Sequence, residues 1–428
     1  MSNFWNFKQL DQLHIELTNA CNAACPMCVR FHNSSPLTRP DLTITQITLE
    51  QFKKWLPPEI IKKCKLILFC GVHGDPCTAR DFLEICEYID KSSSSTRVEF
   101  NTNGGMRNPE WWTKVGQLFA KNKDKDWTAV FSIDGLKDTN QIYRRNVKWR
   151  VLEQNVRAYT KQGGKSYWDF LVFRHNEHQI DKAKKLSKKW GITNFTPKKA
   201  LGVDNGVSLK GMPALNKQGQ VDYWIQAPLN SEWRNLENPV GEEERYAWTF
   251  KPEEYRFQKK HKLKKRSWKE RVDRFYEDLH LHNVEEHDSC QIYCKSQNKR
   301  GDNKVYKEVF IDCSGIVMPC CYMATHLNST YSSIETLQLH KHMNEYGWEK
   351  FNLHNRTLKE ILDEQHLNNV FANTWDKPSI ADGKTLYCAQ TCGKISSIDK
   401  IFTHKDVEGN RYTRFCEIEE FHKEKNKK

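Results

Sequence analysis

The sequence predicts an α/β fold, a partial (β/α)6 barrel followed by a smaller C-terminal α+β module. Apolar runs of strand length alternate six times with amphipathic stretches of helix length over residues 1–200. The alternation is lost from residue 201, where the chain becomes polar, aromatic and charged. Cysteines are absent from residues 87–289 and return at Cys290, so a second module is expected there.

Each predicted unit pairs one strand with one helix. The strand-like runs lie at 13–17, 65–70, 97–103, 128–134, 167–173 and 194–199. The central runs are apolar, as expected for strands covered on both faces. Helix-like stretches lie near 47–63, 80–91, 109–121, 139–161 and 177–190. Asp81 and Pro109 stand where helices would begin, and Gly191 where one would end. Six units are fewer than the eight of a closed barrel, so an open-sided barrel is expected.

The 428 residues exceed the usual size of one domain, and three segments are predicted. Residues 1–200 form the barrel. Residues 201–289 form a linker or insertion with a helical piece at 268–282. Residues 290–428 form the second module, with a hairpin over 304–321 that turns near Ser314–Gly315 and a helix over 357–373.

Composition limits the location and the partners. No run of 18 or more apolar residues occurs, and the N-terminus lacks the pattern of a signal peptide, so we expect no membrane contact and a cytoplasmic location. The 15 cysteines should then be thiols or metal ligands. Much of the net charge of +13 lies in the basic run 259–271 and after Glu420. Such runs are usually solvated, and an acidic partner is the alternative.

The motif Cys21-x3-Cys25-x2-Cys28 directly follows the first predicted strand. Three thiolates can hold three irons of a 4Fe–4S cluster. The fourth iron would stay open to bind a molecule through an amine and a carboxylate. A zinc site would need a fourth ligand, and His14 or His32 could supply it. We expect the remaining early cysteines to be small buried apolar residues: Cys64, Cys70, Cys77 and Cys86.

At this motif the chain resembles the radical S-adenosylmethionine (SAM) superfamily, whose CxxxCxxC motif lies in the loop after the first strand. Segment 70–77 resembles the GGEP-type motif of that superfamily, with Asp75 where Glu is usual. Segment 100–105 resembles the third-strand segment near SAM. Segment 131–135, followed by 140–145, is similar to the SIDG…R pattern of the peptide-modifying branch. The resemblance implies SAM contacts from Gly74, Asp75, Asn101, Asn103, Ser132, Asp134 and one of Arg144, Arg145 and Arg150, of which Arg145 is preferred.

The later cysteines resemble the SPASM and twitch modules that hold auxiliary clusters in radical SAM enzymes. The full SPASM run CxxCx5CxxxC does not occur. The shorter twitch form, with one auxiliary 4Fe–4S cluster, is expected on Cys294, Cys320, Cys388 and Cys392. Cys290, Cys313 and Cys321 compete for these places, and a structural zinc on the same four cysteines is the alternative. Cys416 is expected to be a spare core residue.

The resemblance implies an oxidoreductase that uses SAM to form a 5′-deoxyadenosyl radical and abstract a hydrogen from its substrate. The auxiliary cluster would support net oxidation or cross-linking of a peptide or protein side chain, or of a small alcohol or sugar. An electron donor such as flavodoxin or ferredoxin is implied. One alternative is a nucleotide or nucleic-acid substrate, suggested by the basic run with Trp268, Tyr255 and Phe257. The other is a non-catalytic iron–sulfur or zinc protein.

Overall fold

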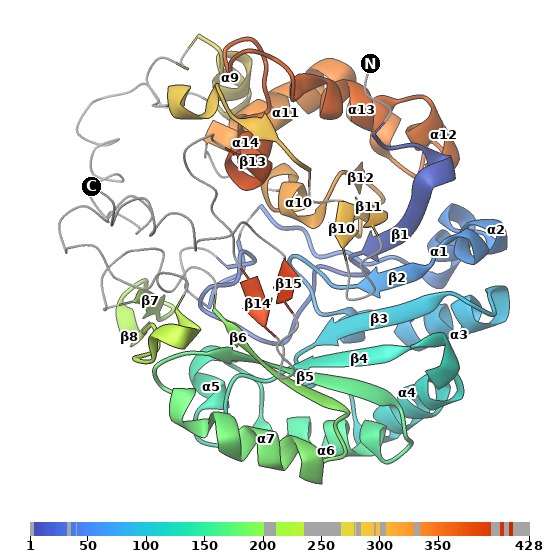
Figure 1. Ribbon diagram of the computed structural model, residues 1–428, viewed down its shortest axis with the longest axis vertical. Helices are drawn as coiled ribbons and strands as arrows, with labels where there is room; N and C mark the ends of the chain where they lie inside the picture. The colour runs from blue at the N-terminus through green and yellow to red at the C-terminus, as the bar shows by residue number, and fades with distance from the viewer. Residues whose placement is uncertain are drawn as a thin grey trace.

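One mostly parallel sheet with helices packed outside it forms the centre of the computed structural model, which confirms the predicted α/β fold (Figure 1). The structure describes residues 4–31, 36–39, 41–200, 211–234, 267–277, 279, 284–294, 297–299, 305–328, 334–394, 403–405 and 411–413. His32, Tyr255, Phe257, Cys416 and most of the basic run 259–271 lie outside these ranges.

Six parallel strands follow one another in chain order across the sheet. They are β1 (Leu10–Ile15), β2 (Leu66–Phe69), β3 (Arg97–Thr102), β4 (Thr128–Ser132), β5 (Lys165–Val172) and β6 (Asn194–Lys199). Each overlaps one of the predicted strand-like runs. Among the described strands β6 is the last on its side, where Pro197 is tolerated because an edge strand needs fewer N–H donors.

The helices between these strands also match the predicted stretches. They are α1 (Leu49–Trp55), α2 (Pro58–Lys63), α3 (Phe82–Ser92), α4 (Pro109–Lys121), α5 (Asn140–Tyr143), α6 (Trp149–Thr160) and α7 (Ile180–Lys189). Pro109 is the first residue of α4, which Asn108 caps by accepting the Trp111 N–H at 2.9 Å. Gly191 follows α7 at φ +78°, as expected of a residue that ends a helix. Asp81 precedes α3, but its carboxylate accepts the Leu49 N–H at 2.9 Å instead of capping that helix.

The two faces of the sheet differ, and the expectation of apolar strands covered on both faces is wrong for β3 and β5. Residues along both strands alternate between buried and half-buried. The buried set packs against the helices: Phe100 lies 5.1 Å from Phe119 of α4, and Phe131 lies 5.6 Å from Tyr159 of α6, both measured between ring centroids. The half-buried residues on the other face are largely polar. They include Glu99 and Asn101 of β3 and Tyr167 and Asp169 of β5, with Ser132 of β4 and Lys198 of β6 on the same face.

The first strand of the predicted C-terminal hairpin joins the main sheet, which the sequence did not predict. Strand β11 (Val305–Ile311) pairs with the other side of β1, with Leu13 opposite Val309. Strand β10 (Gln297–Lys299) pairs antiparallel with β11. The predicted hairpin is confirmed, because β12 (Val317–Met318) returns along β11 after a turn in which Gly315 adopts φ +83°. The segments 1–200 and 290–428 therefore share one sheet, and the three predicted domain boundaries stay a prediction.

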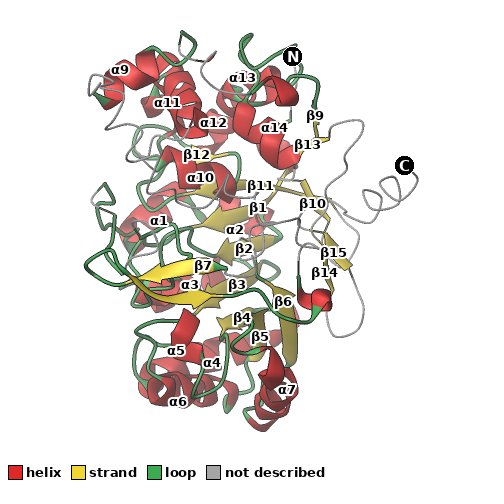
Figure 2. Ribbon diagram, turned by 90° about the vertical axis from the view of Figure 1, so that its left-hand side faces the viewer, coloured by secondary structure: helices red, strands yellow, loops and turns green. Residues whose placement is uncertain are grey.

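The remaining C-terminal elements are mainly helical. They are α9 (Trp268–Asp273), α10 (Cys321–Leu327), α11 (Ile334–Tyr346), α12 (Leu358–Asp363), α13 (His366–Val370) and α14 (Leu386–Cys392). Figure 2 shows α9 and α11–α14 at one end of the stacked strands and α4–α7 at the other. The predicted helix 357–373 is divided into α12 and α13 at Gln365, whose φ is +64°.

The N-terminal residues lie against these C-terminal helices. The Trp5 N–H donates to Asn368 Oδ1 at 2.9 Å, and Asn368 Nδ2 donates back to Trp5 O at 2.6 Å. A second hairpin, formed by β7 (Met212–Leu215) and β8 (Val221–Ile225), lies beyond β6 in the chain. None of the helices in the described ranges combines the length and apolar character needed to cross a bilayer.

Candidate functional site

The Cys21–Cys28 loop follows the carboxyl end of β1, the edge at which barrel enzymes place their active sites. Local hydrogen bonds hold the loop in a compact conformation. The Cys28 N–H donates to Cys25 O at 3.0 Å, and Arg30 Nη1 donates to Cys21 O at 2.8 Å. Cys25 is buried, and Cys21 and Cys28 are half-buried. Desolvation, followed by the charge of Cys25, raises the pKa of Cys28 to about 11. The pKa of Cys21 is raised by desolvation, then by Asp75, Cys25 and Cys28. The three sulfurs therefore lie within electrostatic reach of one another.

Polar hydrogens point at two of these sulfurs. Asn103 Nδ2 lies 3.6 Å from Cys21 Sγ, and Arg144 Nη1 lies 3.7 Å from Cys25 Sγ. A cation and an amide donor beside a sulfur stabilise a thiolate more than a neutral thiol. Three clustered cysteines with such donors fit the ligand set of a 4Fe–4S cluster.

A single metal ion fits these residues less well. Within the described ranges, no three His, Cys, Asp or Glu side chains are arranged to hold one ion. The thiolates of an iron–sulfur cube bind different irons, so they stand farther apart than the ligands of one ion. His14, considered as a fourth zinc ligand, instead places Nε2 2.6 Å from Cys70 O.

The Gly74–Asp75 segment packs directly on this loop. A Cβ atom on Gly74 would lie 1.7 Å from Thr18 O, so only glycine fits. The Asp75 N–H donates to Ala20 O at 2.9 Å. The Asp75 carboxylate accepts the Asn103 N–H at 2.8 Å, Asn103 Nδ2 at 2.7 Å and Thr102 Oγ1 at 3.0 Å. Asp75 therefore holds Asn103 in place beside Cys21.

The other predicted SAM-contacting residues lie at the ends of β3 and β4. Asn101 and Ser132 are half-buried on the polar face of the sheet, and Asp134 follows the end of β4. Asp134 is 0% exposed and accepts Arg144 Nε at 2.5 Å and the Leu171 N–H at 2.7 Å. Desolvation raises the pKa of Asp134, although Arg144 opposes the shift.

The three arginines considered at sequence level lie in different surroundings. Arg144 reaches Cys25 and Asp134. Arg145 is held elsewhere, since its Nε donates to the Tyr223 hydroxyl and its Nη1 to Leu215 O, both at 2.7 Å. Arg150 is exposed. The structure therefore brings the guanidinium of Arg144, and not that of the preferred Arg145, to the cysteine loop. Arg145 meets the loop through its backbone O, which accepts the Ala24 N–H at 2.9 Å.

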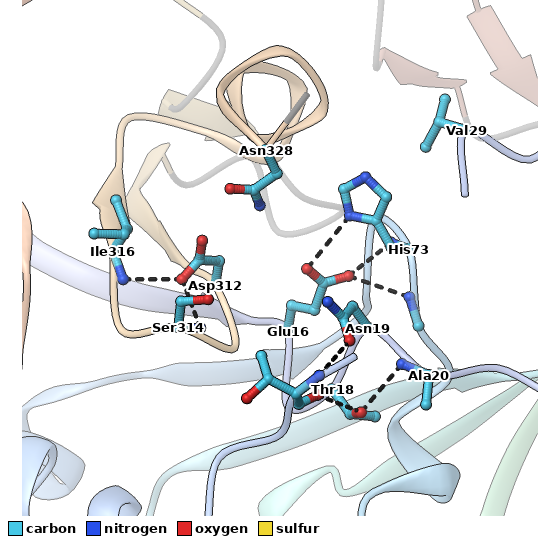
Figure 3. Close-up of polar contacts among 12 residues, drawn as sticks. Glu16, Thr18, Asn19, Ala20, Val29, His73, Asp312, Ser314, Ile316 and Asn328 are labelled. Carbon is cyan, nitrogen blue, oxygen red and sulfur yellow. Dashed lines mark hydrogen bonds and ion pairs between the residues drawn. The ribbon is translucent and has the colours of Figure 1, made fainter. Parts of the chain in front are cut away.

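A buried group of titratable side chains escaped the sequence analysis. Glu16, His73 and Asp312, here called the acid–histidine cluster, are 1%, 2% and 2% exposed and follow β1, β2 and β11. Figure 3 shows Glu16 pointing toward His73, with Asp312 and Asn328 alongside. Glu16 Oε1 accepts the N–H groups of His73 and Gly74 at 2.6 and 3.2 Å, and His73 Nδ1 lies 3.6 Å from Glu16 Oε2.

Asp312 is held by the turn that follows β11. Its Oδ1 accepts the N–H groups of Ser314 and Ile316 at 2.8 and 2.9 Å. Desolvation raises the pKa of Asp312 to about 6, and the charge of Glu16 adds to the shift. Asp312 of the C-terminal hairpin thus lies within electrostatic reach of Glu16, which holds the Gly74 segment.

The four late cysteines selected from the sequence line one pocket. Its wall consists of Trp5, Cys294, Pro319, Cys320, Tyr322, Met323, Tyr387, Cys388, Thr391 and Cys392. Cys388 and Cys392 lie one turn apart on α14 and so share a face. Pairing of β9 (Gln291–Ile292) with β13 (Gly393–Lys394), extended by the Tyr293 N–H donating to Cys392 O at 2.9 Å, brings Cys294 to Cys392. Cys320 immediately precedes α10.

The electrostatics of these cysteines agree with their sharing one pocket. The pKa values of Cys294, Cys320 and Cys388 are raised well above the usual range by desolvation, and in each case Cys392 raises them further. Backbone N–H groups of Met323 and Tyr322 act against the shift at Cys320. Four sulfurs around one pocket fit the donor set of a four-thiolate cluster, whose thiolates bind different irons. A structural zinc fits less well, because no three of the described ligand side chains are arranged to hold one ion.

The competing cysteines lie in different surroundings. Cys290 is buried, with Sγ 3.5 Å from Ala389 O. Cys313 is buried beside Asp312 and Glu16, whose charges raise its pKa in addition to desolvation. Cys321 is half-buried next to Cys320. Among the early cysteines, Cys64, Cys77 and Cys86 are buried in the main core, whereas Cys70 is half-buried.

Comparison with known proteins gives a likeness of fold only. No protein-family model and no curated protein matches the chain. A solved structure of anSMEcpe with bound AdoMet is similar over 86% of this chain and 84% of that one, at 15% identity and a TM-score of 0.42. Streptococcus suis SuiB bound to the precursor peptide SuiA is similar over 84% and 66%, at 12% identity and a TM-score of 0.43. BtrN in complex with AdoMet and 2-DOIA is similar over 91% and 94%, at 11% identity and a TM-score of 0.35.

Proposed function

We propose that the chain is a radical SAM enzyme whose Cys21, Cys25 and Cys28 hold a 4Fe–4S cluster with SAM at its fourth iron. The observation that carries the proposal is the convergence of these three sulfurs at the carboxyl edge of the sheet, with polar hydrogens directed at two of them. When bound, the cluster supplies the electron that cleaves SAM into methionine and a 5′-deoxyadenosyl radical.

The Gly74 segment is proposed to receive the amino group of SAM. The Glu16 carboxylate accepts hydrogen bonds from the backbone N–H groups of His73 and Gly74, and Ala20 O accepts one from the Asp75 N–H. These bonds fix the direction of the segment, so its carbonyl oxygens are the acceptors that it offers to an ammonium group. Because Asp75 is engaged with β3, its side chain would act by positioning Asn103.

The polar face of the sheet is proposed to bind the rest of SAM and the substrate. Asn101 and Ser132 lie at the carboxyl ends of β3 and β4, the same edge of the sheet that the cysteine loop follows at β1. Farther along the sheet, Lys198 of β6 forms an ion pair with Asp169 of β5. A polar, half-buried surface suits a peptide side chain or a small alcohol or sugar, because each hydroxyl or amide it loses from water can be hydrogen-bonded again.

The pocket lined by Cys294, Cys320, Cys388 and Cys392 is proposed to hold an auxiliary 4Fe–4S cluster of the twitch type. With four thiolate ligands such a cluster supplies an electron acceptor, which would make the reaction a net oxidation. A protein such as flavodoxin or ferredoxin would reduce the first cluster. A nucleotide or nucleic-acid substrate stays an untested alternative, because most of the basic run on which it depends lies outside the described residues.

The experiment is anaerobic reconstitution with iron and sulfide, reduction with dithionite, and measurement of 5′-deoxyadenosine formed from SAM. The wild-type chain should form it, and Cys25→Ala should not. Cys64→Ala, which removes a buried thiol outside both cysteine groups, is the matched control and should retain activity. A non-catalytic iron–sulfur or zinc protein would give no 5′-deoxyadenosine from any of the three.

A further inference from the structure

Arg144 lies between a proposed cluster ligand and a buried carboxylate. Its Nη1 is 3.7 Å from Cys25 Sγ, and its Nε is 2.5 Å from Asp134 Oδ2. The Asp134 side chain is 0% exposed and the Arg144 side chain 18%. One guanidinium therefore connects a sulfur of the loop to an anion inside the protein.

The pair is held firmly in this place. Asp134 Oδ1 accepts the Leu171 N–H at 2.7 Å, and the Asp134 N–H donates to Asn140 Oδ1 at 2.9 Å. The Arg144 N–H donates to Asn140 O at 2.8 Å. Asp134 just after β4 and Arg144 at the end of α5 are thus both fixed through Asn140. The guanidinium cannot turn away without breaking an ion pair shielded from water.

The surroundings of the other two cysteines are different. Cys21 receives the neutral amide of Asn103 at 3.6 Å, and Asn103 is itself held by Asp75. The charged neighbour of Cys28 is Arg30, but Arg30 Nη1 donates its hydrogen bond to Cys21 O at 2.8 Å. Cys25 is therefore the sulfur of the three that has a direct hydrogen bond from a cation among the described residues.

We propose that Arg144 and Asp134 act as positioning residues that set the reduction potential of the cluster through Cys25, with opposite signs. This inference rests on the proposed function. Reduction adds one negative charge to the cluster, and hydrogen bonds and net charge around the sulfurs tune its potential. The guanidinium stabilises the reduced form. The carboxylate offsets part of that effect, because it lies on the far side of the same cation.

The test is a redox titration, followed by electron paramagnetic resonance, of the full chain reconstituted anaerobically. The signal that changes on addition of SAM identifies the cluster at Cys25. Arg144→Gln should lower its midpoint potential, with the equilibrium constant for reduction falling on the order of tenfold, or ~59 mV for one electron. Asp134→Asn should move the potential in the opposite direction, because it leaves the guanidinium charge unopposed.

Arg107→Gln is the control. Its guanidinium donates to Cys77 O at 2.9 Å and Ala79 O at 2.6 Å, so the potential should not move. A purely structural role for the pair would shift both variants the same way or neither, and either result overturns the inference. If Arg144→Gln binds no cluster, the midpoint potential of Asp134→Asn tests the inference by itself. A rise supports the inference, and a fall or no change overturns it. If the wild-type chain binds no 4Fe–4S cluster, the proposed function fails as well.

Discussion

Substitution of Asp312 by Asn tests whether the acid–histidine cluster makes stability depend on pH. Burial raises the pKa of Asp312 from its ordinary 3.8 to about 6. Between these values the folded protein binds more protons than the unfolded chain, so the free energy of unfolding must fall as the pH rises through about 6. A pKa raised by about two units, at ~1.36 kcal/mol per unit, lowers the free energy of unfolding by about 3 kcal/mol at neutral pH. Roughly half of this, on the order of 1 kcal/mol, develops between about pH 5 and pH 7.5.

Asn keeps the Oδ1 acceptor for the Ser314 and Ile316 N–H groups but cannot ionise. Urea unfolding under anaerobic conditions, followed by tryptophan fluorescence, should show the wild type losing on the order of 1 kcal/mol of unfolding free energy relative to Asp312→Asn from about pH 5 to pH 7.5. The same substitution at exposed Asp376 controls for the loss of one negative charge. A difference between wild type and Asp312→Asn that stays constant across this range would refute the reasoning.

Three further predictions concern the two cysteine groups and the core. Gly74→Ala should destabilise the protein by about 3 kcal/mol or more and abolish SAM binding, because the new Cβ would lie 1.7 Å from Thr18 O. A thermal unfolding curve and a calorimetric SAM titration that both match the wild type would contradict this. Cys392→Ala should lower the iron content from about eight to about four atoms per chain while 5′-deoxyadenosine formation persists. Unchanged iron and sulfide contents would contradict the proposed auxiliary cluster. Phe100→Ala, at a residue 0% exposed and packed on α4, should cost about 3–5 kcal/mol in denaturant unfolding, and a cost below about 1 kcal/mol would contradict the packing.

Local sequence pattern was sufficient for most of the sheet. The strands β1–β6 and the helices between them depend on neighbouring residues, as the matching start of α4 at Pro109 illustrates. Strand β11 was expected as half of the hairpin over 304–321, but its place beside β1 could not be found in this way. Its pairing with β1 joins Leu13 to Val309, and nothing near either residue specifies a partner so distant in the chain. The polar face was misjudged for a similar reason, since apolar residues on β3 and β5 are confined to the face that packs on helices.

In the candidate site, too, local features could be predicted from the sequence and long-range contacts could not. The Cys21–Cys28 spacing and the i, i+4 spacing of Cys388 and Cys392 are local and visible in the sequence. The approach of Cys294 to Cys392 depends on the pairing of β9 with β13, which no spacing reveals.

Neighbouring residues can also have opposite surroundings that no motif predicts. Arg144 and Arg145 are adjacent, yet the first faces Cys25 and the second Tyr223, according to how the chain turns after α5. Glu16, His73 and Asp312 come from three strands and meet only when β11 joins the sheet. The one sequence signal was His73, which departs from the GGEP-type pattern.

The central claim is that three thiolates leave one iron of a cluster open for SAM. The most direct measurement is the electron paramagnetic resonance spectrum of the dithionite-reduced, anaerobically reconstituted chain, recorded with and without SAM in the Cys388→Ala/Cys392→Ala background. We predict that SAM shifts the g-values of the remaining 4Fe–4S signal, because it binds the open iron. A well-formed signal that SAM leaves unchanged would contradict the account.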